Sequence, residues 1–396
     1  MNRISDLWYR LPWVVRRLVV PAVVIALLVL YPKYYVDLGF PTWVPTLSVM
    51  VQMCVFVTMA LGLNVVVGYA GLLDLGYVAF YAAGAYVAGW FATQQFANIT
   101  FQWKFHVVPV AVPSTVSGIH INVWLLLAAG AAFAAVLGIL IGLPTLRLRG
   151  DYLAIVTLGF GEIIPQAVNN GDDWFGRNVT NGPNGLTPID QLGFGATLHN
   201  HFAFLPASYS DSFDRLNYYY WTGLALVAFT LFCCIRLRDS RLGRAWVAIR
   251  EDEIAAAAMG VPLMRTKTWA YAIGAFFGGM AGCFYAIQKS STFPADFSLN
   301  ISIFVLCMVI LGGMGNVWGV MLGGVVLTYL NYQGLGAIGK TANIDISIYS
   351  FGIFGGVIVA MMLLRPEGLI PSRRRRVEFR AAEEGVAVGQ AVVTHE

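Results

Sequence analysis

Two long apolar stretches flank the charged run Asp239-Ser-Arg-Leu-Gly-Arg-Ala-Trp-Val-Ala-Ile-Arg-Glu-Asp-Glu-Ile-Ala-Ala-Ala-Ala-Met-Gly260. The segment 236–267 around it holds 11 of the 46 charged residues of the chain in 32 positions. The run predicts one helix, because Asp239 or Ser240 can cap its start and Gly260, followed by Pro262, can end it. A hydrophilic helix has no use inside a bilayer, so we expect it to dock onto a soluble partner.

A short apolar stripe runs along this predicted helix. Leu242, Trp246 and Ile249 fall at positions i, i+4 and i+7, which places them on one face. We expect that face to lie in a groove of the partner.

The composition is that of a membrane protein. Of the 396 residues, 58% are hydrophobic and only 12% are charged, whereas soluble domains carry roughly 25% charged residues. Since each helical span needs about 20 apolar residues, there is room for about ten spans. The predicted spans are at about 14–31, 44–67, 76–92, 123–143, 152–168, 218–235, 268–288, 301–314, 317–331 and 346–364. The expected fold class is therefore all-α, a polytopic membrane helix bundle with about ten transmembrane helices.

The distribution of Lys and Arg orients these spans. With both termini in the cytoplasm, the inner segments carry 19 of the 25 Lys and Arg residues, as the positive-inside rule requires. We predict a cytoplasmic N-terminal segment 1–13, a transmembrane domain 14–364 and a basic, disordered cytoplasmic tail 365–396. Within the transmembrane domain, 169–217 is predicted to be an external loop and 236–267 a cytoplasmic loop.

Glycines at helical spacing predict close packing of the spans, because helices in lipid approach one another through small residues. Four sets have this spacing: Gly138 and Gly142; Gly274, Gly278 and Gly282; Gly315, Gly319 and Gly323; Gly352 and Gly356. The spacing fits packing within the chain and also packing against a second subunit.

Two carboxylates lie at membrane depth in glycine-interrupted stretches, Asp74 in 68–76 and Glu162 in 157–165, where Gly159, Gly161 and Pro165 disfavour a regular helix. An ionisable group within a span costs at least about 2.5 kcal/mol, so it faces protein or a water-filled path. Broken backbone at this depth is tolerated where it lines a cavity. The candidates for a substrate path are Asn64, Asp74, Tyr77, Tyr81, Thr157, Gly159, Gly161 and Glu162. The structural alternative is that Asp74 is a cap and Glu162 is hydrogen-bonded between helices.

The sequence predicts no metal site, no cofactor and no catalytic site. The five cysteines lie in apolar stretches without CxxC spacing. The stretch 334–339 matches GxGxxG but follows a predicted membrane span instead of a strand, so a dinucleotide site is not expected. The sequence contains no Walker A motif, no ring-forming pattern typical of a channel, and no His, Asp and Glu cluster of the kind a membrane enzyme needs.

Four stretches of the sequence, Ala60–Tyr81, Leu146–Glu162, Asn181–Gly185 and Gly243–Gly260, are distinctive enough to compare with a known family, and 311–316 and 364–369 also fit. Over roughly residues 45–371 the chain resembles the LivM-type permease subunit of bacterial ATP-binding-cassette importers for branched-chain and other hydrophobic amino acids. A permease of the related urea or amide importers is the alternative within the family, and the run 74–81 favours the amino-acid type. A stand-alone secondary transporter is the alternative from another class, but it would have little use for a charged docking helix.

The resemblance implies a non-catalytic, multi-pass subunit of the bacterial plasma (inner) membrane. Its partners would be a second, related permease subunit, two cytoplasmic ATP-binding subunits that hydrolyse ATP, and an external substrate-binding protein. The charged run is similar to the coupling helix through which such permeases contact their ATPases, which makes the following residues candidates for that contact: Arg244, Trp246, Arg250, Glu251, Asp252, Glu253, Ala255, Ala256 and Gly260. The usual loop has Glu-Ala-Ala from six to four residues before its glycine. Here Ile254 stands at the first of these positions, and Glu253 is one residue early.

Overall fold

The computed structural model describes residues 26–33, 43–96, 100–103, 118–148, 150–174, 177–192, 212–337, 350–365 and 368–370. The predicted N-terminal segment 1–13, most of the first span and most of the tail 365–396 lie outside the described residues.

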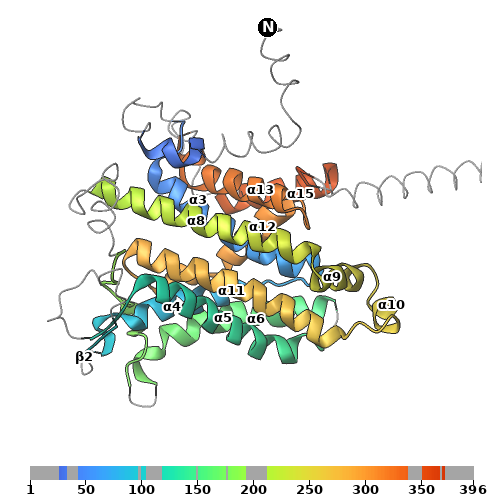
Figure 1. Cartoon of the computed structure of the whole chain (residues 1–396), viewed down its shortest axis with the longest axis horizontal. Helices are drawn as coiled ribbons and strands as arrows, with labels where there is room; N and C mark the ends of the chain where they lie inside the picture. Colours follow the sequence, from blue (N-terminus) through green and yellow to red (C-terminus); the bar gives the residue numbers. More distant parts are fainter. Residues whose placement is uncertain are drawn as a thin grey trace, which may run out of the picture.

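Helices make up most of the described chain (Figure 1). Apart from two short helices of the charged segment, the α-helices are α3 (Leu47–Leu63), α4 (Val78–Phe91), α5 (Val123–Thr145), α6 (Asp151–Asn169), α8 (Ser212–Asp239), α11 (Leu263–Lys289), α12 (Leu299–Gly312), α13 (Val317–Tyr329) and α15 (Ser350–Leu364). Each predicted span from 44–67 onward coincides with one of them. Five helical segments of the described chain are long and apolar enough to cross a membrane: Leu47–Tyr69, Val123–Thr145, Leu216–Asp239, Leu263–Lys289 and Pro294–Gly312.

Helix α11 lies at the centre of the bundle and packs against α3, α4 and α5. Its glycines permit close approach: a Cβ atom at Gly282 would overlap the carbonyl oxygen of Tyr81 in α4, and one at Gly84 in α4 would overlap the carbonyl oxygen of Gly279. Gly138 likewise meets α11, and Gly319 and Gly323 bring α13 against α12. Three of the four predicted glycine sets thus pack within the chain. Among the described residues, nothing lies within 4 Å of a Cβ built at Gly352 or Gly356 of α15, so the fourth set makes no such contact there.

A small sheet departs from the all-α prediction. It consists of β1 (Ala92–Thr93), β2 (Thr100–Trp103) and β3 (Gly118–Ile121) in the order β1-β3-β2. Strand β3 pairs antiparallel with β1 and parallel with β2. The sheet connects α4 to α5, in a stretch with Thr, Ile and aromatic residues that favour extended backbone.

The charged segment forms two helices where one was predicted. Helix α9 (Arg241–Glu251) begins at Ser240, whose side chain accepts from the amide of Gly243, and α10 (Glu253–Ala258) ends before Gly260, which has φ +85°. The prediction of a continuous helix was wrong because Asp252 takes an extended conformation and caps α10, accepting from the amides of Ile254 and Ala255. In Figure 1, α9 and α10 lie at one end of the bundle and the sheet at the other.

Candidate functional site

The described chain has a break in helical geometry directly after α3. The buried segment η1 (Asn64–Tyr69) is a π-helix, and residues 70–77 then run without regular structure to α4. The Asn64 side chain is fully buried, and its Oδ1 accepts from the amide of Gly315, 2.9 Å away in the α12–α13 connection. Since π-helical turns often occur at functional positions, this break is the first component of the candidate site.

Asp74 lies in this irregular segment and is 1% exposed. One carboxylate oxygen accepts from the amide of Gly76 at 2.9 Å, which closes a local turn. The hydroxyl of Tyr271 lies next to the carboxylate. Among the described residues, neither this hydroxyl nor the second carboxylate oxygen has a hydrogen-bond partner of normal geometry. Asp74 therefore shapes the turn and places its carboxylate beside the Tyr271 hydroxyl inside the bundle.

The structure brings the two glycine-interrupted stretches together. The amide of Leu75 donates to Thr157 Oγ1 of α6 at 3.1 Å, and Gly76 lies so close to α6 that a Cβ there would overlap the Thr157 carbonyl. Gly161 completes this contact on the same face of α6, 3.2 Å from Gly76 when a Cβ is built on it. A pairing across about 80 residues of sequence thus joins the segment around Asp74 to α6.

Two hydrogen bonds fix the start of α4. The hydroxyl of Tyr77 donates to the carbonyl of Gly274 at 2.8 Å, and Ser302 Oγ of α12 accepts from the amide of Val78 at 2.9 Å. Tyr81 is buried one turn further on, with its ring 5.5 Å from that of Phe297. Ser302 was missed by sequence reasoning, although a lone hydroxyl in the apolar run 301–312 is a usable signal.

Glu162 does not join this cluster. Helix α6 runs without interruption through Gly159, Gly161 and Pro165, so the prediction of irregular backbone there was wrong. A single proline removes only one hydrogen-bond donor, and the rest of the helix holds the geometry. In a regular helix Glu162 lies on the face opposite Thr157 and is exposed.

The apolar stripe of α9 packs against the chain itself. Trp246 is fully buried, and its Nε1 donates to the carbonyl of Thr266 at the start of α11, 2.7 Å away. Ile249 is also buried. The prediction that this face lies in a groove of a partner was therefore wrong, because the bundle supplies the groove.

Arg250 connects α9 to the π-helix. Its Nη1 donates to the carbonyl of Gly68 at 2.6 Å. Its methylenes lie against Gly71, which has φ +71° and where a Cβ would come within 2.8 Å of Arg250 Cγ. Arg250 thus links α9 directly to the backbone of η1.

Helix α10 is held on one side and open on the other. Glu253 forms an ion pair with Lys267 Nζ at 2.8 Å, and the Lys267 side chain is buried. Ala256 is buried, whereas Ile254 and Met259 are 73% and 85% exposed. Of the other predicted coupling residues, the exposed ones are Arg244, Arg250, Glu251, Asp252, Ala255 and Gly260. Lys267 was not among the predicted coupling residues, because nothing in the sequence around it indicates an ion pair with Glu253.

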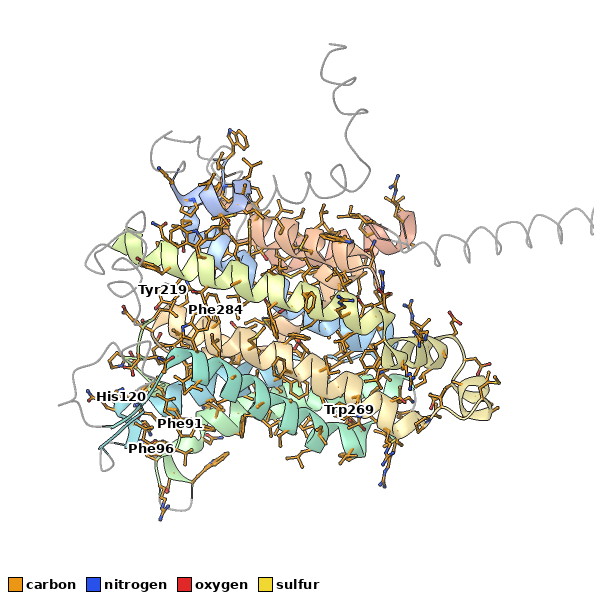
Figure 2. All side chains as sticks on the ribbon, viewed as in Figure 1. Phe91, Phe96, His120, Tyr219, Trp269 and Phe284 are labelled. Carbon is orange, nitrogen blue, oxygen red and sulfur yellow. The ribbon has the colours of Figure 1, made fainter. Side chains whose placement is uncertain are left out.

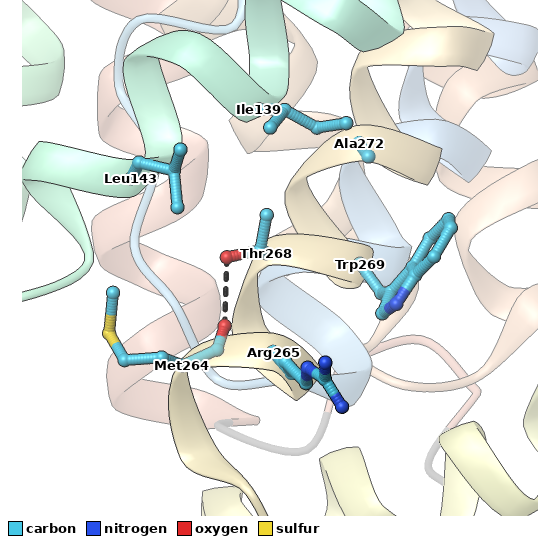
Figure 3. Close-up of a pocket in the computed structure, with 7 residues that line it drawn as sticks. All are labelled: Ile139, Leu143, Met264, Arg265, Thr268, Trp269 and Ala272. Atoms are coloured by element: carbon cyan, nitrogen blue, oxygen red, sulfur yellow. Dashed lines mark hydrogen bonds between the residues drawn. The ribbon is translucent and has the colours of Figure 1, made fainter.

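An apolar pocket lies beside the first turns of α11 (Figure 3). It has a volume of about 280 Å³ and is lined by Ile139, Leu143, Met264, Arg265, Thr268, Trp269 and Ala272. The hydroxyl of Thr268 donates to the carbonyl of Met264 at 2.8 Å. The pocket contains none of the predicted site residues. Exposed Trp269 and the neighbouring Arg265 are the residue types that mark a membrane–water boundary.

A buried pair lies at the opposite end of the bundle from Trp269 (Figure 2). His120 Nδ1 of β3 is 2.6 Å from Asp190 Oδ2, and both side chains are buried. Burial raises the pKa of Asp190 above its usual value, and the hydrogen bond with His120 offsets part of that rise. The pair ties the sheet to the segment 186–192. Because His120 and Asp190 are 70 positions apart in the sequence, no local spacing predicts this pair.

Replacing His120 with alanine is expected to destabilise the protein by about 1–3 kcal/mol, because a buried carboxylate loses its partner. The pKa of Asp190 would rise further, so the folded chain would keep the proton over a wider pH range. Stability from a raised carboxyl pKa falls as pH rises. The loss should therefore be larger at pH 7.5 than at pH 4.5 in thermal unfolding of the purified protein. His120→Gln keeps a donor and serves as the control. Equal losses at both pH values would contradict this account.

Within the described residues, no three His, Cys, Asp or Glu side chains come close enough to hold a metal ion. The geometry instead comprises a helix pair at one end of the bundle, joined by Arg250 to a broken span. The profile of the family described as "Branched-chain amino acid transport system / permease component" matches residues 46–365. The chain belongs to this permease family.

Individual members of the permease family match this chain over different shares of their length. The chain is 36% identical over 355 residues, 87% of its length, to the high-affinity branched-chain amino acid transport system permease protein LivM of Escherichia coli (strain K12), of which it covers 74%. It is 25% identical to a probable LivM permease of Methanocaldococcus jannaschii, covering 79% of this chain and 90% of that protein. It is also 27% identical to the permease protein LivH of Escherichia coli, over 41% of this chain and 50% of LivH. No solved structure matches the chain significantly.

Proposed function

We propose that the chain is the membrane subunit of an ATP-driven importer that moves branched-chain or other hydrophobic amino acids across the bacterial plasma membrane. The permease family and the names of its LivM relatives support this function and substrate class. We further propose about ten spans with both termini in the cytoplasm. In support, each proposed span after the first coincides with a described helix.

The proposed partners are a second, related permease subunit, two cytoplasmic ATP-binding subunits and an external substrate-binding protein. The similarity of this chain to both LivM and LivH of one organism, each named as a permease of a high-affinity branched-chain amino acid transport system, supports a pair of related permeases. ATP hydrolysis would take place on the ATP-binding subunits.

The observation that carries the proposal is the construction of α9 and α10. Three contacts of Trp246, Arg250 and Glu253 fasten the pair to α11 and η1. The far side presents two large, exposed apolar side chains, Ile254 and Met259. An element anchored on one side and apolar on the other is suited to receive a force from a soluble partner and pass it into the bundle.

The proposed mechanism is alternating access. Closure of the ATP-binding subunits on nucleotide would displace α9 and α10, and Arg250 would carry the displacement to the π-helix. The irregular segment 70–77 follows η1 and contacts α6, so the movement would reach the proposed substrate path. Asn64, Asp74, Tyr77, Tyr81, Thr157 and Gly161 would form the part of the path inside the bundle, and Gly159 and Glu162 would form a separate part on the open face of α6.

The test replaces both Ile254 and Met259 with aspartate. Because buried apolar anchors contribute most of the affinity at an interface, co-purification with the ATP-binding subunit and uptake of radiolabelled leucine should each fall at least roughly tenfold. Ile254→Leu together with Met259→Leu keeps the apolar surface and is the matched control. If the aspartate variant still binds the ATP-binding subunit and transports normally, α10 is not the docking element.

A further inference from the structure

We infer that the exposed face of α6 is the surface on which the second permease subunit packs, and that Glu162 on that face lines the substrate path between the two subunits. The inference rests on the proposed function and deepens it by assigning the interface to one helix.

Helix α6 has two clearly different faces. Thr157 and Gly161 lie on the buried face with Leu153 and Ala154, and this face meets the segment around Gly76. The opposite face carries Tyr152, Ile155, Glu162 and Ile163, all exposed. Ile155 and Ile163 are 65% and 58% exposed, so this face offers a large apolar surface that the described residues leave open.

The position of Glu162 determines what can cover this surface. It lies 11 residues beyond Asp151 in the 19-residue helix, or about 16 Å along the axis at 1.5 Å per residue. With α6 as the proposed span 152–168, this position is near the middle of a hydrocarbon layer about 30 Å thick. A carboxylate turned toward acyl chains at this depth costs at least about 2.5 kcal/mol. The face must therefore meet protein or a water-filled path.

Helix α5 shows the composition of a face that suits lipid. Its exposed large side chains are all apolar, and its sequence from Val123 to Thr145 contains no ionisable residue. Phe133, Val136 and Leu140 are exposed in this way. The two helices are neighbours in sequence and similar in length, so the carboxylate on α6 distinguishes a protein-facing surface from a lipid-facing one.

The surface also has features that suit a helix partner and an amino-acid substrate. Gly159 lies between Ile155 and Glu162 on the open side, with nothing within 4 Å of a Cβ built on it, so another helix can approach closely. The Glu162 carboxylate on this open face is an acceptor that fits the ammonium of an α-amino acid.

A photoreactive amino acid placed at Ile155 or Ile163 tests the interface in the assembled importer. Irradiation should link these positions to the second permease subunit, whereas Val136 and Leu140 of α5, the matched controls, should give no such product. Links to a second copy of this chain, links to lipid alone, or equal products from α5 and α6 would each overturn the inference. Co-purification of the ATP-binding subunit in the same samples separates the two claims. If it persists without the α6 product, the interface is wrong and the proposed function stands.

Glu162→Gln tests the path. The variant keeps size and hydrogen bonding but loses the charge, so leucine uptake should fall at least roughly tenfold, as expected for a lost charge-assisted hydrogen bond. The α6 photoproduct and the bound ATP-binding subunit should be unchanged. Unaltered uptake by Glu162→Gln would remove Glu162 from the path.

Discussion

Replacing Gly282 with valine is expected to leave almost no folded protein in the membrane. A side chain there meets the carbonyl oxygen, carbonyl carbon and Cα of Tyr81, all backbone atoms of α4. They cannot rotate away as a flexible side chain can, so α4 and α11 would have to separate. Overpacking that a core can absorb costs about 1–3 kcal/mol, and a clash with backbone exceeds that range. The measurement is the yield of monodisperse protein in detergent and its unfolding temperature.

Gly355→Val is the matched control for this variant. Gly355 is also a helical glycine in an apolar segment, but nothing lies within 4 Å of a Cβ built there. Its yield and unfolding temperature should stay close to those of the parent protein. Similar behaviour of the two valine variants would show that the α4–α11 contact is not as close as the structure has it.

Replacing Arg250 with alanine is expected to uncouple ATP hydrolysis from transport. The variant loses the hydrogen bond to the Gly68 carbonyl and the packing on Gly71. A hydrogen bond from a charged group is worth about 1.5–3 kcal/mol, which corresponds to a roughly tenfold or larger effect. Leucine uptake should fall by at least that factor in cells that contain all subunits. ATP hydrolysis by the purified complex should persist, because the exposed side of α10 is untouched.

Arg241→Ala is the control within the same helix. Arg241 is exposed in the first turn of α9 and is not among the predicted coupling residues. Its loss removes a positive charge from α9 without touching η1, so uptake should remain near that of the parent. If both variants transport equally well, Arg250 does not transmit the movement.

The helices themselves were predictable from the sequence. Long apolar runs specify them, because every backbone polar group in lipid must be satisfied within its own segment. The spacing of Gly274, Gly278 and Gly282 also predicted that this helix lies close to a neighbouring helix, since only small residues permit such an approach. The ends of the charged segment followed from Ser240 and Gly260, whose conformations are local properties of those residues.

The features that sequence reasoning missed depend on contacts between distant segments. From the sequence, Asp252 could lie inside one continuous helix or cap a second one. The ion pair of Glu253 with Lys267, which fixes the position of α10, joins segments that the sequence does not link. Which face of α6 is buried depends on Gly76, about 80 residues earlier. The partner of Arg250 is a backbone carbonyl, which any residue at position 68 would offer. Helical periodicity predicts the face of the helix on which a residue lies, but not the segment that packs against that face.

The backbones of α4 and α11 touch at Gly84, Gly279 and Gly282, so no side chains lie between them that could exchange one rotamer for another. Tightly packed contacts of this kind do not deform gradually. The two helices must therefore travel as a single piece during any switch between inward and outward opening. The proposed hinge is the π-turn at Asn64–Tyr69 together with the irregular residues 70–77 that follow it, because the regular α-helical hydrogen-bond pattern is interrupted there.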